Sequence, residues 1–167
     1  ILSGPAGGVI GAVRTSEQAG FDKIISFDMG GTTAKSCLIS GGKPAVTTDF
    51  ETARVHRFKK GSGLPVRLPV IDMMEIGAGG GSIARVDDTG LLKVGPDSAG
   101  AMPGPACYGL GGEAPTVTDA ALVLGYLDPA AKLGGQVRLH MDRAEQSIRT
   151  FIAEPLGMSV IEAASGI

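Results

Sequence analysis

The sequence predicts an α/β fold in which helices flank a mixed sheet that begins with a three-stranded antiparallel meander. Apolar residues predict a first strand at 23–28, and alternating residues predict further strands at 35–40 and 45–55. A turn rich in glycine and threonine joins the first two strands, and Ser40-Gly41-Gly42 joins the next two. Helical patterns before and after these strands complete a single domain of mixed class.

The first turn, Asp28-Met29-Gly30-Gly31-Thr32-Thr33, has the chemistry of a phosphate-binding hairpin. Glycines let backbone N–H groups and the two threonine hydroxyls surround a phosphate, while Asp28 can hold a hydrated divalent cation. A Walker P-loop would require a helix after the turn, whereas residues 35–39 alternate like a strand. The motif therefore predicts an actin-like, or RNase H-like, ATPase lobe. An ordinary glycine-rich hairpin between two core strands is the alternative.

The other elements follow from spacing and turn residues. A helix over residues 3–19 has a proline in its first turn and ends at Gly20. We expect a basic loop at 57–65, an apolar strand or short helix at 68–77, a hairpin formed by 82–86 and 91–94, and helices at 117–126, 142–153 and 159–165.

Composition excludes several classes of function. The 167 residues are 43% hydrophobic and 19% charged, as in ordinary globular domains, and the formal charge of −2 argues against nucleic acid as partner. No apolar run approaches the ~20 residues of a membrane-spanning helix. Two cysteines form neither a metal-binding spacing nor a disulfide framework, so we expect reduced thiols and a cytoplasmic location. Because the chain opens on Ile1 rather than methionine, we expect a fragment of a longer protein.

A second glycine-rich segment, residues 76–83, superficially resembles a dinucleotide fingerprint. A dinucleotide site requires a helix after the glycines, whereas this segment continues into an alternating strand pattern. We instead predict a mobile loop whose N–H groups face a phosphate or oxyanion, formed by Gly79, Gly80, Gly81 and Ser82. Asp72 and Glu75 are nearby acid, base or metal candidates, and a solvated acidic rim is the alternative.

Six motifs occur in a fixed order, at residues 3–8, 27–33, 76–84, 94–101, 103–109 and 115–120. In their order and spacing the chain resembles the family of hydantoinase A, 5-oxoprolinase and acetone carboxylase β subunits. The resemblance covers nearly the whole chain. It implies the second lobe of a two-lobed actin-like ATPase, because the first phosphate motif and the adenine loop of full-length members are absent from residues 1–167.

The resemblance also implies a reaction. ATP with Mg²⁺ or Mn²⁺ would phosphorylate a carbonyl oxygen, which leads to opening of a hydantoin or 5-oxoproline ring. Carboxylation of a small ketone such as acetone is the close alternative, and an actin-like regulatory or assembly module is an alternative of another class. Members usually work with a hydantoinase B type subunit or domain, so we expect a hetero-oligomer and an inactive isolated segment.

Roles for individual residues complete these expectations. Asp28 would position the metal, Gly30, Gly31, Thr32 and Thr33 would hold phosphates, and Gly79–Ser82 would shape the acceptor side. Lys35 stands where family members commonly place Asp, and it would contact phosphate, stabilise a carboxylate such as Asp28, or face solvent. Asp119, in the last motif, is either a helix cap or a metal or substrate ligand.

Histidines and a basic run remain without a firm role. His56 could act as a general base, but a lone histidine at a strand end is more often a surface residue. The basic run of Arg54, Arg57, Lys59 and Lys60 fits a solvated strand end better than a phosphate site. We assign no role to His140.

Overall fold

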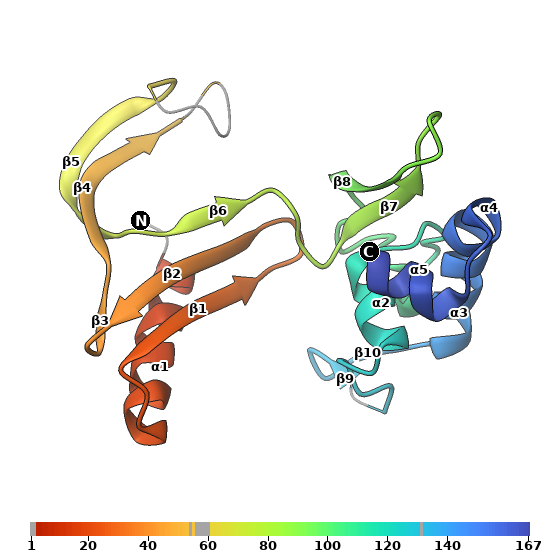
Figure 1. Ribbon diagram of the computed structural model, residues 1–167, viewed down its shortest axis with the longest axis horizontal. Coiled ribbons are helices and arrows are strands. Elements are labelled where there is room, and N and C mark those ends of the chain that lie inside the picture. Colours follow the sequence, from red (N-terminus) through yellow and green to blue (C-terminus); the bar gives the residue numbers. More distant parts are fainter. Residues whose placement is uncertain (1–2, 54, 56–60, 131) are drawn as a thin grey trace. The chain divides into compact units, whose positions relative to one another are not determined.

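The computed structural model of the chain describes residues 3–53, 55, 61–130 and 132–167 (Figure 1). It is a mixed α/β structure with antiparallel strand pairs. The chain divides into two compact units, the first formed by Ile1–Asp28 and Lys35–Glu75 and the second by Met29–Ala34 and Ile76–Ile167. His56, Arg54, Arg57, Lys59 and Lys60 lie outside the described residues.

Among the described residues, the first unit contains one helix and most of six strands. They are α1 (Ser3–Ala19), β1 (Lys23–Met29), β2 (Ala34–Ser40), β3 (Lys43–Pro44), β4 (Val46–Thr52), β5 (Leu64–Ile71) and β6 (Met74–Ile76). The terminal residues Met29, Ala34 and Ile76 of β1, β2 and β6 belong to the second unit. Helix α1 confirms the predicted helix, and Gly20 after it has the left-handed φ of +79° that glycine adopts without strain.

Helix α1 packs on the β1–β2 hairpin (Figure 1). Val9 of the helix and Cys37 and Ile39 of β2 are buried together, with Ile24 of β1 partly buried against them. The alternation of β2 puts its odd-numbered residues on this face, as the sequence pattern predicts. The hairpin that carries the phosphate motif is therefore supported by a small apolar core.

The predicted three-stranded meander is wrong in its third strand. The sheet order is β1-β2-β3, with β6 also paired to β2, but β3 contains only two residues. Ile39 pairs with Pro44 and Ser40 with Lys43, and beyond them Ala45 N still donates to Leu38 O at 2.9 Å. Ala45 O in turn accepts from Asp72 N at 2.8 Å, so the chain passes here from β2 to a new partner. The residues expected to continue the meander form β4, which instead pairs antiparallel with β5, from Val46 opposite Ile71 to Thr52 opposite Leu64.

The second unit contains a hairpin, several short helices and a small β ladder. The elements are β7 (Ser82–Val86), β8 (Leu92–Ser98), the 3₁₀ helix η1 (Ala106–Tyr108), α2 (Val117–Val123), β9 (Lys132–Leu133), β10 (Val137–Arg138), α3 (Met141–Ile148), the π-helix η2 (Arg149–Ala153), α4 (Glu154–Leu156) and α5 (Val160–Gly166). The predicted hairpin and the three predicted helical regions are confirmed, although the middle helix changes to π-helical geometry at Arg149.

The core of the second unit lies between the β7–β8 hairpin and the C-terminal helices. Ile148 and Ile152 are fully buried there, together with the small residues Ala84, Ala120 and Ala163. Capping boxes begin α2 at Thr116 and α5 at Ser159. None of the described helices is long and apolar enough to cross a membrane.

Candidate functional site

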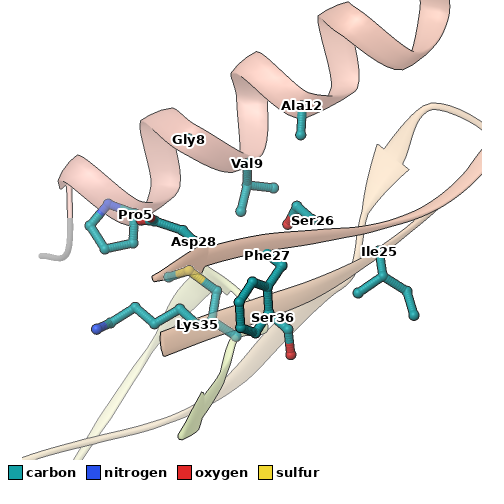
Figure 2. A pocket seen from close by; sticks show the side chains of 11 residues that line it. Pro5, Gly8, Val9, Ala12, Ile25, Ser26, Phe27, Asp28, Lys35 and Ser36 are labelled. Atoms are coloured by element: carbon teal, nitrogen blue, oxygen red, sulfur yellow. The ribbon is translucent and has the colours of Figure 1, made fainter. Parts of the chain in front are cut away.

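Asp28 lines a pocket of about 380 Å³ in the first unit. Figure 2 shows Val9 and Ala12 of α1 pointing toward β1, with Asp28 beside the first turns of the helix. The pocket also includes Phe27 and Lys35. A side chain on Gly8 would start 3.9 Å from Asp28 Oδ2, so the small residue at this position leaves the carboxylate uncovered. Asp28 is exposed, so its carboxylate is accessible to a cation.

Lys35 forms an ion pair with Glu75. Lys35 Nζ lies 3.6 Å from Glu75 Oε1, and the two side chains are 15% and 44% exposed. The pair bridges β2 and β6, which are neighbours in the sheet. Of the roles expected for Lys35, the structure therefore supports stabilisation of a carboxylate, and that carboxylate is Glu75.

Asp72 lies between β5 and β6 and is exposed. Its N–H donates to Ala45 O at 2.8 Å, and its carboxylate does not line the Asp28 pocket. Burial raises the pKa of the Cys37 thiol, and the charge of Asp72 adds to this rise. Among the described residues, no three His, Cys, Asp or Glu side chains gather in a group that could hold a metal ion.

The turn at residues 30–33 belongs to the second unit. Gly30 N donates to Thr33 O at 2.9 Å and closes the turn. Gly30, Gly31 and Thr32 are exposed, whereas Thr33 is 9% exposed. Within the described part of the chain, the N–H groups of Gly31 and Thr32 have no acceptor, and a side chain on Gly31 would meet no atom within 4 Å. The turn thus presents two unpaired donors with open space at Gly31.

The glycine loop at 79–82 supports this turn. Gly80 N donates to Gly30 O at 2.9 Å, and Gly81 N donates to Gly31 O at 2.7 Å. The other two N–H groups are bonded inside the loop, since Ser82 N donates to Gly79 O and Gly79 N donates to Ser82 Oγ, each at 2.9 Å. Each of these four N–H groups therefore has a partner within the chain, and none of them faces an oxyanion in this structure. A binding role for the loop, with Ser82 as a further donor, stays a prediction.

Close packing explains why the loop consists of glycines. A Cβ on Gly79 would lie 2.6 Å from Gly30 O and 2.7 Å from Thr32 N, both backbone atoms that cannot yield easily. A Cβ on Gly81 would lie 2.9 Å from Gly31 O. Because none of the three glycines has a left-handed φ, the backbone conformation does not require glycine here. The requirement comes from the approach of the turn.

Two further segments hold the glycine loop in place. Thr118 of α2 donates to Gly80 O through both its N–H and its hydroxyl, each at 2.8 Å. Ala99, just after β8, donates its N–H to Gly81 O at 2.8 Å. The hairpin turn, the glycine loop, the segment after β8 and the start of α2 are therefore linked by consecutive hydrogen bonds. Thr118 is not among the predicted site residues, although its place at a helix start in Thr116-Val117-Thr118-Asp119 is a signal that could have identified it.

Asp119 is a structural residue in this unit. Its side chain is fully buried and completes the capping box of α2 with Thr116. Oδ1 accepts from Cys107 N at 2.7 Å, and Oδ2 accepts from Thr116 N at 2.8 Å, Thr116 Oγ1 at 2.7 Å and Ala106 N at 3.3 Å. The expectation that Asp119 binds metal or substrate is wrong in this structure, because both oxygens are occupied and enclosed.

The remaining residues of interest lie apart from the turn. His140 precedes α3 without capping it through its side chain, and its N–H donates to Cys107 O at 2.8 Å. Burial raises the pKa of the Cys107 thiol, and the nearby Asp119 raises it further. A second pocket, of about 360 Å³, runs along α3 and η2 and contains none of the predicted site residues.

Comparison with known proteins agrees with the motif order. A family model described as Hydantoinase/oxoprolinase matches residues 1–167. The chain is 47% identical to caprolactamase subunit alpha of Pseudomonas jessenii and 42% identical to acetone carboxylase beta subunit of Xanthobacter autotrophicus, with 100% of the chain covered in both. It is 35% identical to 5-oxoprolinase 1 of Arabidopsis thaliana over 99% of the chain.

Two solved structures are similar as well. The ATP-dependent caprolactamase from Pseudomonas jessenii matches with a TM-score of 0.79 and 46% identity, and nucleotide-free acetone carboxylase matches with 0.74 and 40%. Each comparison covers 99% of this chain, but only 23% and 22% of the solved chains. The chain likewise spans 23%, 22% and 14% of the three sequence relatives.

Proposed function

Because the chain belongs to the hydantoinase/oxoprolinase family, we propose that it is the phosphate-binding lobe of an ATP-dependent enzyme that activates the carbonyl of a cyclic amide. We also propose that the lobe is of the actin-like type, and the strand–turn–strand form of the phosphate motif supports this. Its sheet carries the motif at the β1–β2 turn. The similarity to two ATP-dependent enzymes supports a role for ATP.

The observation that carries this proposal is that the backbone N–H groups of Gly31 and Thr32 have no acceptor among the described residues. An exposed turn with free N–H groups and a threonine hydroxyl has the donor set that anionic oxygens need. The absence of any atom within 4 Å of a Cβ on Gly31 leaves room for a phosphate to approach the backbone. The hydrogen bonds from Gly80 and Gly81 hold the turn in place before a ligand binds. Less conformational entropy of the turn is therefore lost on binding.

Asp28 is the proposed metal ligand. Mg²⁺ commonly uses one or two carboxylates and completes its octahedral shell with water and phosphate oxygens. A single exposed carboxylate in a pocket fits that requirement without a cluster of ligands. Mg·ATP would supply the transferable phosphoryl group. Lys35, held by Glu75 at the same pocket, would neutralise negative charge, while Asp72 stays a prediction from sequence.

The proposed substrate is a cyclic amide such as a hydantoin, 5-oxoproline or a related lactam. Transfer of the phosphoryl group to the amide oxygen would make the ring carbon a better electrophile, and water would then open the ring, with ADP and phosphate as co-products. The names of the caprolactamase and 5-oxoprolinase relatives support this class. Carboxylation of a small ketone is the second candidate, because the acetone carboxylase structure also matches.

We further propose that the complete protein works in a hetero-oligomer with a hydantoinase B type subunit or domain. Two relatives are themselves named as subunits, which supports such an assembly. Both cysteines are free thiols, as expected in a reducing compartment such as the cytoplasm.

The test is coupling of ATP consumption to substrate conversion in the complete enzyme. ADP release should be slow without substrate and should rise in fixed proportion to ring opening when the correct cyclic amide is added. ADP release that instead depends on a small ketone and bicarbonate would favour the carboxylase. Ring opening at the same rate without ATP would refute the proposal.

A further inference from the structure

We propose that Thr118 is a positioning residue that fixes the Gly30–Thr32 turn through the Gly80–Gly81 peptide group. The proposal rests on the function assigned above, namely that this turn binds the phosphates of ATP. Thr118 does not touch the turn itself. Its hydroxyl and N–H both donate to Gly80 O, and the N–H on the other side of the same peptide group donates to Gly31 O.

The geometry makes this peptide group a direct link. Thr118 N and Oγ1 each lie 2.8 Å from Gly80 O, and Gly81 N lies 2.7 Å from Gly31 O. Donors that bind a carbonyl polarise its peptide group and strengthen the bond made by the N–H of that group. Loss of the Thr118 hydroxyl bond would therefore weaken the bond from Gly81 N to Gly31 O. This bond holds the residue whose own N–H is one of the two free donors of the turn.

The helix start explains why Thr118 can serve here. Thr118 is the second residue of α2, where backbone N–H groups have no partner inside the helix. The Thr118 N–H donates to Gly80 O in the glycine loop. The buried Asp119 caps the same N-terminal end of α2 together with Thr116. The hydroxyl occupies the space that a side chain at Gly80 would need, since a Cβ there would lie 2.8 Å from Thr118 Oγ1.

The first experiment compares Thr118→Val with Thr118→Ser in the complete enzyme. One neutral hydrogen bond is worth about 1 kcal/mol, so Thr118→Val should raise the KM for Mg·ATP about fivefold. Thr118→Ser keeps the hydroxyl and should change this KM by less than about twofold. Tyr108→Phe is the matched control, because the Tyr108 phenol lies near the Thr118 side chain without taking part in the bond to Gly80 O, and it should likewise leave the KM nearly unchanged.

A double-mutant cycle with Gly80 keeps the test valid if the valine variant folds poorly. The methyl group in Gly80→Ala should displace the Thr118 hydroxyl and raise the KM much as Thr118→Ala does. In the Thr118→Ala background, Gly80→Ala should then add little. If the increase in KM for Mg·ATP in the double variant equals the product of the two single increases, the proposal is wrong.

Melting temperatures separate a positioning role from a purely structural one. If Thr118→Val melts lower but keeps the wild-type KM for Mg·ATP, Thr118 only stabilises the fold and the inference fails. The Asp28→Asn variant distinguishes failure of the positioning role of Thr118 from failure of the proposed function. If that variant also keeps wild-type turnover, the nucleotide assignment is wrong. If it loses turnover while Thr118→Val behaves as wild type, only the positioning role is wrong.

Discussion

Two aspartates illustrate how hydrogen-bond partners decide what a carboxylate can do. Asp28 is exposed in a pocket, and its carboxylate accepts no hydrogen bond from the described residues, so both carboxylate oxygens remain available to a cation. Asp119 is fully buried and accepts four hydrogen bonds from backbone and threonine donors. Both lie in motifs on which the resemblance to the family rests, and the sequence alone left the cap and the ligand open for Asp119. The geometry resolves this in favour of the cap.

Asp119→Ala should destabilise the segment between η1 and α2. Four donors would lose their acceptor inside the protein, which should cost roughly 3 kcal/mol of local stability. Hydrogen exchange at the Ala106 and Cys107 N–H groups should accelerate accordingly in the complete protein. Glu162→Ala is the matched control, because Glu162 completes the exposed capping box of α5, and it should perturb only that helix. Unchanged exchange at Ala106 and Cys107 would contradict the structural role.

The glycine loop and the hairpin turn form one unit of structure although Gly80 and its partner Gly30 lie 50 positions apart in the chain. The loop donates its N–H groups to carbonyls of the turn, while the turn keeps free N–H groups at Gly31 and Thr32. Substitutions in the two segments should therefore differ in effect. Damage to the loop should affect stability and activity together, whereas damage to the turn should affect nucleotide use first.

Gly79→Ala should lower both the melting temperature and ATP-dependent turnover of the complete enzyme. The new methyl group would lie within 2.7 Å of the backbone of Gly30 and Thr32, so the turn must shift. Gly31→Ala meets no atom and should lower turnover at an unchanged melting temperature, because the methyl group blocks the approach of a phosphate. Gly11→Ala, in the open middle of α1, is the control and should leave turnover unchanged. A Gly79 variant that melts and turns over like wild type would contradict this packing.

Elements defined by local pattern could be predicted from the sequence, and their long-range partners could not. Alternation predicted β1, β2, β7 and β8, and helical spacing predicted α1, α2 and α5. The same alternation cannot say which strand pairs with β4, which lies beside β5 and not beside β2. The motif identified Gly79–Gly81, but their role depends on contacts with Gly30 and Thr32 that no local pattern encodes.

At the scale of the whole molecule, this chain corresponds to one segment of much longer relatives. The chain covers less than a quarter of the solved relatives, so each turnover measurement proposed here uses the complete protein. Within the segment, most of the shared motifs have a physical reason. Residues 79–82 hold the turn, Thr118 and Ala99 hold the loop, and Asp119 holds the start of α2. Much of the motif set therefore supports one short turn.

The central claim, that the Asp28 motif binds Mg·ATP, is tested most directly by the ATP-dependent turnover of Asp28→Asn in the complete enzyme. Loss of a metal-positioning carboxylate should remove several kcal/mol of transition-state stabilisation, which lowers turnover at least about a hundredfold. Asp49→Asn, which changes another exposed carboxylate of the first unit, should leave turnover unchanged. Turnover of the Asp28 variant within about threefold of wild type, at equal melting temperature, would contradict the claim.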